Sequence, residues 1–131
     1  MPVEPNPEQV AEIQGVAGGP DDGPLVMLNL NRYRDRDAYL RYGEVAQRVL
    51  ERVGGRVLWH APVQATVVGE GEERFDDAIA VWYPSAAAFL QLATDPELLE
   101  ARPHRLEGLE RAALLRCDGD AQPTLSAPEA G

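Results

Sequence analysis

Lysine is missing from this chain of 131 residues, and all 12 of its basic residues are arginine. Without lysine the chain has no Schiff-base lysine, no pyridoxal-phosphate lysine and no lysine of a phosphate-binding loop, which excludes the enzymes that depend on them. Exclusive use of arginine is typical of a GC-rich bacterial genome, so we expect a bacterial protein.

Cysteine and long apolar runs are also scarce. The single cysteine, Cys117, cannot form an internal disulfide, and its place at the end of an apolar run predicts a small buried side chain rather than a nucleophile. The longest apolar run, Ala78 to Tyr83, has six residues, whereas a membrane-spanning helix needs about 20. The first residues have neither the basic nor the apolar stretch of a secretory signal. We therefore expect a cytoplasmic protein without a membrane partner.

Acidic residues are in excess, with 22 acids against 12 basic residues and a net charge of −10. Residues 1–24 contribute −5 and residues 118–131 contribute −3, so the middle of the chain is close to neutral. Because binding a phosphate backbone needs a basic face, we expect no nucleic-acid partner. The acidic ends favour solubility rather than recognition of a cation.

Turn-forming residues divide the chain into three parts. In residues 1–24, Asn6 and Pro7 predict the start of a short helix, and a linker of Gly, Pro and Asp follows it. Residues 25–117 form the predicted folded domain. Residues 118–131 are rich in Pro, Ala, Ser and acids, a composition that predicts a disordered acidic tail.

Hydrophobic periodicity predicts four strands and two main helices in the domain. The predicted strands are residues 25–31, 56–69 (bent near Ala61-Pro62), 75–83 and 112–117. The predicted helices are residues 38–53, ended by Gly54-Gly55, and residues 85–94, capped by Ser85. A further helical stretch begins at Asp95-Pro96, and a helical or irregular segment around His104-Arg105 leads to the last strand. This order predicts an α+β, ferredoxin-like βαββαβ fold.

The predicted strands are apolar at consecutive positions rather than at alternate ones. Residues 25–28, 78–83 and 112–115 show this pattern, which predicts that both faces of the sheet are buried. Two helices can cover only one face of a four-stranded sheet. We therefore expect a second copy of the chain on the other face, and hence a homodimer.

A series of short motifs runs through residues 6–117. These are Asp21-Asp22-Gly23-Pro24, Met27-Leu28-Asn29-Leu30, Arg32-Tyr33, Tyr39 and Tyr42, Gly54-Gly55-Arg56, Asp77, Tyr83-Pro84-Ser85, Ala88-Phe89, Asp95-Pro96 and His104-Arg105. In order and spacing they resemble the family called domain of unknown function 1330 (DUF1330), within the dimeric α+β-barrel superfamily. The resemblance implies the fold and the dimer. It implies no reaction, since the chemistry of the family is largely unassigned.

The chain departs from the family at one point. The family often has a tyrosine shortly after the Asp-Pro pair, and this chain has Leu98 there. A hydroxyl that lines the implied pocket is therefore missing.

Little in the sequence indicates a metal site or a nucleophilic serine. His60, His104 and Cys117 are the candidate soft ligands, and no pair of them has the spacing of a metal-binding motif. Ser85 is expected to cap a helix, and the chain has no Gly-x-Ser-x-Gly motif. We expect neither a metal nor an organic cofactor.

Three polar residues are candidate catalytic groups. Asn29 interrupts an apolar strand, where its amide either bonds nearby backbone or faces a cavity. Tyr42 lies on the inner face of the first main helix and can offer its phenol to a cleft. His104 can transfer a proton near neutral pH, or it is a surface or capping residue.

Four further residues are candidate substrate-binding groups. Arg32 belongs to the Arg-aromatic motif. Arg105 can hold a carboxylate or phenolate, or it can simply pair with a surface acid. Trp59 and Trp82 can supply flat walls to a pocket, although a tryptophan of this kind is more often part of the core.

Three functional hypotheses follow. The first is a small enzyme or binding protein that takes an aromatic or polyketide-like molecule, without a metal, between the sheet and the helices. The second is a monooxygenase of the antibiotic-biosynthesis or haem-degrading type, for which Trp82 and His104 are the relevant residues. The third is a non-enzymatic dimerisation or ligand-binding module. The sequence does not decide whether the protein is an enzyme.

Overall fold

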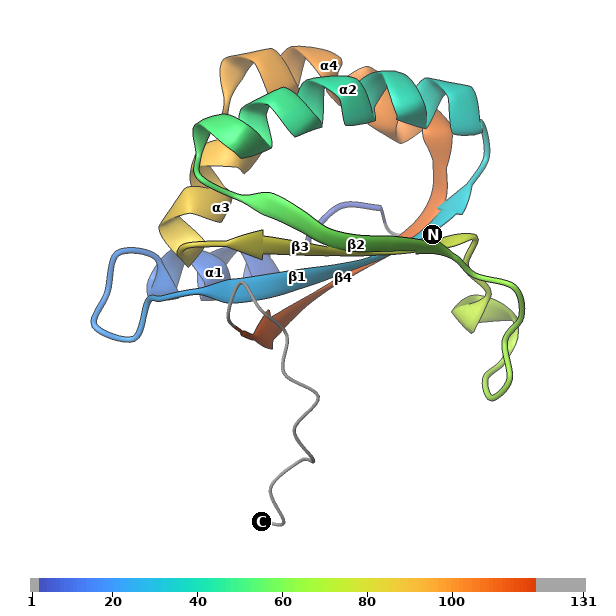
Figure 1. The fold of residues 1–131 in the computed structure, drawn as a ribbon, viewed down its shortest axis with the longest axis horizontal. Coiled ribbons are helices and arrows are strands. Elements are labelled where there is room, and N and C mark those ends of the chain that lie inside the picture. Colours follow the sequence, from blue (N-terminus) through green and yellow to red (C-terminus); the bar gives the residue numbers. More distant parts are fainter. Residues whose placement is uncertain (1–2, 120–131) are drawn as a thin grey trace.

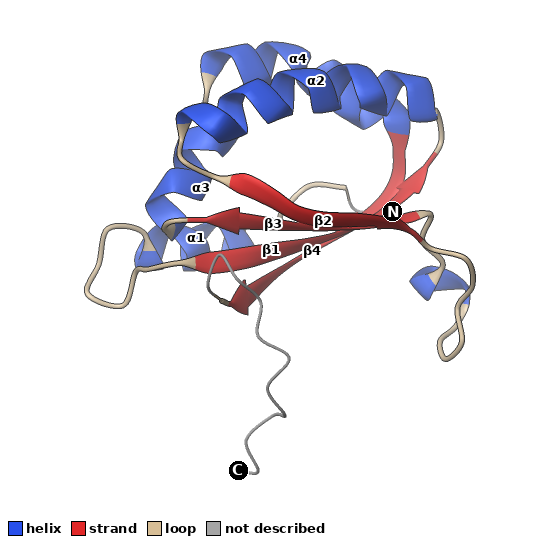
Figure 2. Cartoon of the chain, in the orientation of Figure 1, coloured by secondary structure: helices blue, strands red, loops and turns tan. Residues whose placement is uncertain are grey.

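The computed structural model describes residues 3–119, which form one antiparallel sheet with helices packed on one of its faces (Figures 1 and 2). The strands are β1 (Leu25–Tyr33), β2 (Arg56–Pro62), β3 (Asp77–Tyr83) and β4 (Leu109–Asp118). The helices are α1 (Pro7–Val16), α2 (Arg36–Arg52), α3 (Ala86–Ala93) and α4 (Pro96–Gly108), and a short 3-10 helix, η1 (Gly71–Glu73), lies in the loop between β2 and β3.

The strand order in the sheet is β2-β3-β1-β4, and every neighbouring pair is antiparallel. α2 connects β1 to β2, and α3 and α4 connect β3 to β4. This is the ferredoxin-like arrangement, so the predicted α+β fold class is confirmed.

Alternation along β1 gives the sheet two faces of different character. Leu25 and Met27 point toward the helices, because both belong to the core that α2 and α3 complete. Val26 and Leu28 therefore point to the opposite side. Residues paired across neighbouring strands share a face, so the register assigns the side chains of β2, β3 and β4 as well. We call the two sides the helix face and the open face.

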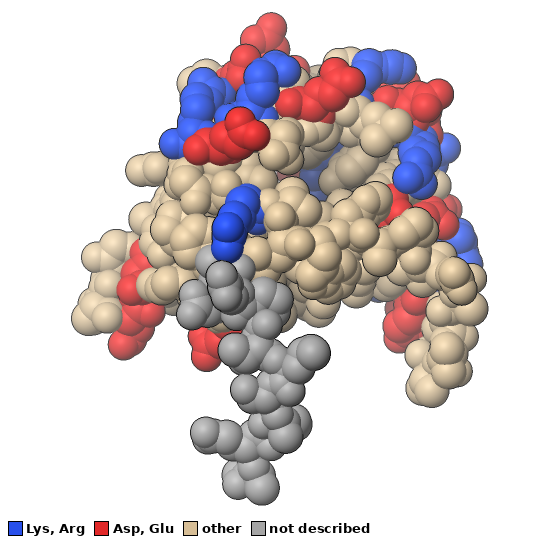
Figure 3. All heavy atoms as spheres, in the orientation of Figure 1, with Lys and Arg blue, Asp and Glu red and all other residues tan. Residues whose placement is uncertain are grey.

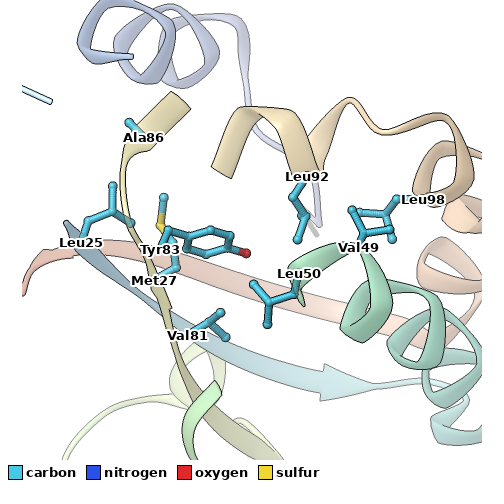
Figure 4. Close-up of a cluster of buried hydrophobic side chains, with 9 residues drawn as sticks. All are labelled: Leu25, Met27, Val49, Leu50, Val81, Tyr83, Ala86, Leu92 and Leu98. Atoms are coloured by element: carbon cyan, nitrogen blue, oxygen red, sulfur yellow. The ribbon is translucent and has the colours of Figure 1, made fainter. Parts of the chain in front are cut away.

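Buried apolar side chains from the sheet and from α2, α3 and α4 form the core on the helix face (Figure 4). These are Leu25, Met27, Val49, Leu50, Val81, Tyr83, Ala86, Leu92 and Leu98. The ring of Phe89 meets Tyr83 edge-on, with 5.3 Å between the ring centroids. Ile13 and Val16 of α1 pack against the same core. Burying a large apolar side chain contributes about 1.5–3 kcal/mol, so this cluster holds the helices on the sheet.

Side-chain caps fix the starts of the helices, at the predicted positions for α1, α3 and α4, whereas α2 begins at Arg36, two residues before its predicted start. Asn6 caps α1, and Asp35, Ser85 and Asp95 cap α2, α3 and α4. α2 ends in a Schellman motif, since Gly54 N–H donates to Glu51 and Gly55 N–H donates to Leu50. Gly54 has a φ of +83°, a conformation that glycine adopts without strain.

The Asp22 carboxylate fastens the linker before β1 to α3. It accepts hydrogen bonds from the backbone N–H groups of Ala86 (2.6 Å) and Ala87 (3.2 Å), and from Gly18 (2.8 Å). These backbone donors, Gly18 first among them, hold the pKa of Asp22 below its ordinary value. The linker contains no helix or strand, but this one side chain fixes it in place.

Two predicted elements differ from the structure. β2 ends at Pro62 rather than at residue 69, because proline has no N–H to donate to the ladder, and residues 63–76 form a loop. The segment around His104-Arg105, predicted to be helical or irregular, is part of one continuous helix, with Pro103 inside α4.

The prediction for Cys117 is wrong. Its side chain is exposed on β4, because the register places it on the open face, which no helix of residues 3–119 covers. The predicted tail at residues 118–131 lies mostly outside the described residues, which end at Gly119.

Gly108 is the point where β1, α2 and α4 meet. Its carbonyl accepts hydrogen bonds from the backbone N–H groups of Arg34 (2.8 Å) and Asp35 (3.2 Å). A Cβ at this position would lie 2.6 Å from the backbone N of Tyr39 and 2.9 Å from its Cα. Only glycine allows the end of α4 to approach the start of α2 so closely.

We predict that Gly108→Ala lowers the free energy of unfolding by about 1–3 kcal/mol, because the new methyl group forces the two helices apart. Urea denaturation measures the change. Gly43→Ala in α2 is the matched control: a Cβ there meets nothing within 4 Å, and the helix gains about 0.5–1 kcal/mol from alanine. An unchanged stability of the Gly108 variant would contradict the close approach.

Candidate functional site

A cleft lies on the helix face, beside the apolar core. Figure 3 shows the surface hollowed between the helix layer and the sheet. The core occupies the helix face near Leu25 and Tyr83. Polar and aromatic side chains gather on the same face toward the end of β1, and we call this region the cleft. The residues that strand register and side-chain contacts place there are Asn29 and Asn31 of β1, His60 of β2, Asp77 of β3, and Tyr39 and Tyr42 of α2.

Three tyrosine rings run in a row from the end of β1 along α2. The ring centroids of Tyr33 and Tyr39 are 5.2 Å apart, and those of Tyr39 and Tyr42 are 5.8 Å apart. Tyr39 and Tyr42 stand three residues apart on α2 and therefore share one side of the helix. Burial raises the pKa of both phenols, and the nearby charge of Arg105 opposes that rise. Both tyrosines consequently stay neutral hydrogen-bond donors at physiological pH.

Asp77 carries a buried negative charge at the start of β3. Its side chain is 1% exposed, and His60 Nε2 lies 3.2 Å from its Oδ1. Arg36 Nη1 lies 3.5 Å from its Oδ2, and the Arg36 guanidinium also sits 5.2 Å from the centre of the Tyr33 ring. A buried carboxylate needs such partners, because an uncompensated charge away from water costs several kcal/mol.

Asn31 and Tyr33 complete the surroundings of Asp77. The buried amide of Asn31, which pairs with Asp77 across the sheet, donates to the Tyr39 hydroxyl at 3.4 Å. Burial, reinforced by the Asp77 carboxylate, raises the pKa of the Tyr33 phenol. Asp77 therefore lies at the centre of a polar cluster supplied by three strands and one helix.

Arg105 brings a positive charge from α4 to the same tyrosines. Its charge acts on the phenols of both Tyr39 and Tyr42. Arg105 Nη1 also donates to the carbonyl of Val3 and lies 3.6 Å from the Glu4 carboxylate, which in turn binds Arg102. The N-terminal segment thus occupies part of the hydrogen-bonding capacity of Arg105.

The three predicted catalytic residues are all on the helix side of the sheet. Asn29 projects from the helix face and donates to the backbone carbonyls of Met27 (3.2 Å) and Ile79 (3.4 Å), so its amide does bond nearby backbone. Tyr42 lies on the α2 side of the cleft. His104 is half-buried on α4, one turn from the buried residues Ala101 and Gly108.

Three of the four predicted binding residues lie on the open face instead. Trp82 pairs with Val26, and Trp59 pairs with Ala80, which pairs with Leu28. Arg32 is buried on the same side, where it donates to the carbonyls of Gly71 (3.0 Å) and Arg74 (3.4 Å). The single pocket expected to combine these tryptophans with Asn29, Tyr42 and His104 therefore does not form within one chain, because the sheet separates them.

The pair of His60 and Asp77 is not evident from the sequence. There His60 is a candidate metal ligand only, and Asp77 is only a motif residue that precedes an apolar strand. The signal that joins them is the pairing of β2 with β3, which sets Pro62 opposite Asp77 and His60 opposite Ile79, two residues away on the same face. Seventeen positions separate the two in sequence, so only a correct hairpin register would have found the contact.

The family described as "Domain of unknown function (DUF1330)" matches residues 25–116. The chain belongs to the DUF1330 family. Its match covers the whole sheet except the last two residues of β4, together with α2, α3 and α4. No curated protein matches the sequence.

Solved structures support the fold of this DUF1330 chain. A protein of unknown function from Rhodopseudomonas palustris is 32% identical, with a TM-score of 0.80 over 92% of this chain and 98% of that one. A dabb family protein with a ferredoxin-like fold from Mesorhizobium loti is 10% identical, with a TM-score of 0.56 over 74% of this chain and 97% of that one. A NIPSNAP-like domain protein from Burkholderia xenovorans is 16% identical, with a TM-score of 0.52 over 82% and 90%. The last two share the fold alone.

Each helix within residues 3–119 is too short or too polar to span a bilayer.

We predict that Tyr39→Phe lowers the free energy of unfolding by about 1 kcal/mol, because the buried Asn31 amide loses the hydroxyl that accepts its hydrogen bond. Thermal and urea denaturation measure the loss. Tyr42→Phe is the matched control, because the Tyr42 hydroxyl makes no hydrogen bond with residues 3–119. We expect this variant to lose less free energy of unfolding. Equal losses in the two variants would show that the Asn31–Tyr39 bond does not matter for stability.

Proposed function

We propose that the protein binds a small, planar, weakly acidic organic molecule of aromatic or polyketide-like type in the cleft, without a metal. The observation that carries the proposal is the row of tyrosine rings on α2, with Arg105 on one side and the His60–Asp77 pair on the other. Tyrosine rings offer flat apolar surfaces together with hydroxyl groups that can bond a ligand oxygen.

Each group has a role that its chemistry suits. The neutral phenols of Tyr39 and Tyr42 can donate to a carbonyl or phenolate oxygen, and Arg105 adds a positive charge that favours an acidic ligand. His104, half-buried on α4, remains a candidate proton-transfer group beside this site. Asn29 helps to form the floor, with its amide nitrogen held by backbone carbonyls and with an amide oxygen that can accept a hydrogen bond.

The monooxygenase hypothesis gains no support from the geometry. It rests on Trp82 and His104, and the sheet separates them, because Trp82 lies on the open face and His104 lies on a helix of the other side. The proposed ligand site is the same whether the protein only binds the molecule or also acts on it. A proton-transfer assay separates a binding module from an enzyme.

The open face supports the homodimer as the second part of the proposal. Trp59 and Leu115 on this face are 44% and 49% exposed, although both are large and apolar. Val26, Leu28 and Leu30 of β1 lie between them on the same face. A contiguous exposed apolar surface of this kind marks an interface, and a second copy offers the same apolar face in return.

The loop of residues 63–76 extends the apolar surface away from the sheet (Figure 1). Val67 and Val68 in this loop are 93% and 92% exposed. The loop is held in shape by Arg32, which bonds the carbonyls of Gly71 and Arg74, and by Thr66, whose hydroxyl donates to the Glu73 carbonyl. Because the loop projects on the open-face side, it suits contact with the second copy. A cytoplasmic location is consistent with such a dimer and remains the sequence-based prediction.

Binding in the cleft is tested by titrating 2-naphthol, a planar weak acid, into the protein and recording NMR shifts. We expect Tyr42→Phe and Arg105→Gln to raise the dissociation constant about 3- to 10-fold, the effect of losing one hydrogen bond or charge. Arg41→Gln, an exposed neighbour on α2, is the control and leaves the constant unchanged. Shifts confined to the indoles of Trp59 and Trp82 would place the molecule on the open face and refute the proposal.

The dimer is tested by sedimentation, which should give about 28 kDa, twice the chain mass of 14.3 kDa. Leu115→Glu puts a charge in the proposed interface, and we expect it to produce monomers at micromolar concentration. Leu40→Glu changes a leucine of similar exposure on α2, 50% against 49%, and should leave the dimer intact. A monomeric wild-type protein would refute the interface.

A further inference from the structure

The Asp77 carboxylate is unusual because it is buried and yet meets an imidazole as well as an arginine. Both of its oxygens are shielded from solvent. His60 Nε2 lies 3.2 Å from one oxygen and Arg36 Nη1 lies 3.5 Å from the other, and the Tyr33 phenol also hydrogen-bonds the carboxylate. A buried carboxylate is costly unless it is paired, so the choice of its partners calls for an explanation.

The need to balance the buried charge explains why Arg36 lies beside Asp77, but it does not explain why His60 lies there too. A guanidinium 3.5 Å from Oδ2 already balances the charge of Asp77. The imidazole is placed on the other oxygen, on an edge strand, and its side chain is 44% exposed. One ring nitrogen of His60 therefore faces the buried carboxylate, while the ring as a whole remains accessible to solvent.

We propose that His60 and Asp77 form a proton-accepting pair, in which His60 is the general base and Asp77 is its positioning residue. This inference rests on the proposed ligand site and adds a reaction class to it. Asp77 holds the proton of the imidazole on Nε2, which leaves Nδ1 as the free acceptor. The same carboxylate stabilises the imidazolium that forms when Nδ1 takes a proton.

The reaction class is proton abstraction from a carbon or oxygen acid. The C–H or O–H bond of the ligand breaks, the proton moves to Nδ1 of His60, and the electron pair stays on the ligand as an enolate or phenolate. The phenols of Tyr39 and Tyr42 donate to the oxygen on which the negative charge develops. No oxidant or metal is needed, since the step moves only a proton. The expected substrate is a planar carbonyl compound with an acidic α-hydrogen, or a phenol.

The charged and titratable groups around His60 come from three elements. Asp77 on β3 lies 3.2 Å from its Nε2, and Arg36 on α2 contacts the other oxygen of that carboxylate. Tyr33 on β1 lies against Asp77 and stays neutral, because burial raises the pKa of its phenol. Replacing Asp77 by an uncharged residue therefore removes the negative charge beside His60 and leaves the Arg36 charge in place.

A probe that reports general bases directly is 5-nitrobenzisoxazole. A base removes its C–H proton, the electron pair forms a nitrile, and the N–O bond breaks to release a coloured nitrophenolate. We expect the wild-type protein to accelerate this reaction at least 10-fold over the same concentration of free imidazole, and His60→Ala to lose that acceleration. Adding imidazole to His60→Ala should restore part of the rate, because the position is half-exposed. Arg41→Gln is the control and keeps the wild-type rate.

The pH profile tests the role of Asp77 separately. The rates of the wild-type protein and of Asp77→Asn are measured across the pH range, and we expect Asp77→Asn to move the midpoint of the profile and to lower its plateau about 10-fold. A purely structural Asp77 would lower the amount of folded protein without moving the midpoint. Circular dichroism at each pH confirms that the variant is folded.

The results separate this inference from the site on which it rests. If 2-naphthol binds in the cleft and His60→Ala still reacts at the wild-type rate, or if the wild-type protein shows no acceleration, the base assignment is overturned and the binding site stands. If 2-naphthol does not bind in the cleft, the proposed function and the inference both fail.

Discussion

The central strand β1 is hydrogen-bonded on both edges while its side chains alternate between two environments, and the rest of the structure depends on this arrangement. Its odd-numbered residues, Leu25 to Asn31, run from the apolar core into the cleft. Its even-numbered residues, Val26 to Arg32, form the open face. A shift of the register by one residue would exchange the two sets, so the core, the cleft and the proposed interface are fixed together.

The buried charge of Asp77 is the second constraint, and it connects the sheet to the site. A carboxylate at 1% exposure holds the start of β3 to β2 through His60 and to α2 through Arg36. The same contacts hold the accessible imidazole of His60 against the buried carboxylate. One compensated charge therefore joins β2, β3 and α2 and positions the imidazole that we propose as the base.

Opposite sides of the sheet carry the two proposed activities of the molecule. Ligand binding is assigned to the helix face, and self-association to the open face, where Arg32 holds the 63–76 loop in shape. Because the sheet lies between them, a dimer formed through the open face leaves the cleft of each copy accessible. Substitutions such as Leu115→Glu and Tyr42→Phe can therefore be interpreted independently.

Sequence by itself determined the order of the strands and helices, the helix starts at Asn6, Ser85 and Asp95, and the family. These depend on local periodicity and on short motifs, which a single chain displays directly. Tertiary structure alone decided which polar residues meet. Trp59 and Trp82 lie outside the expected pocket, because the face on which a strand residue lies depends on register. His60 contacts Asp77 because β2 pairs with β3. A contact across a hairpin depends on the length and geometry of the connecting loop, here residues 63–76. No local sequence pattern encodes that geometry.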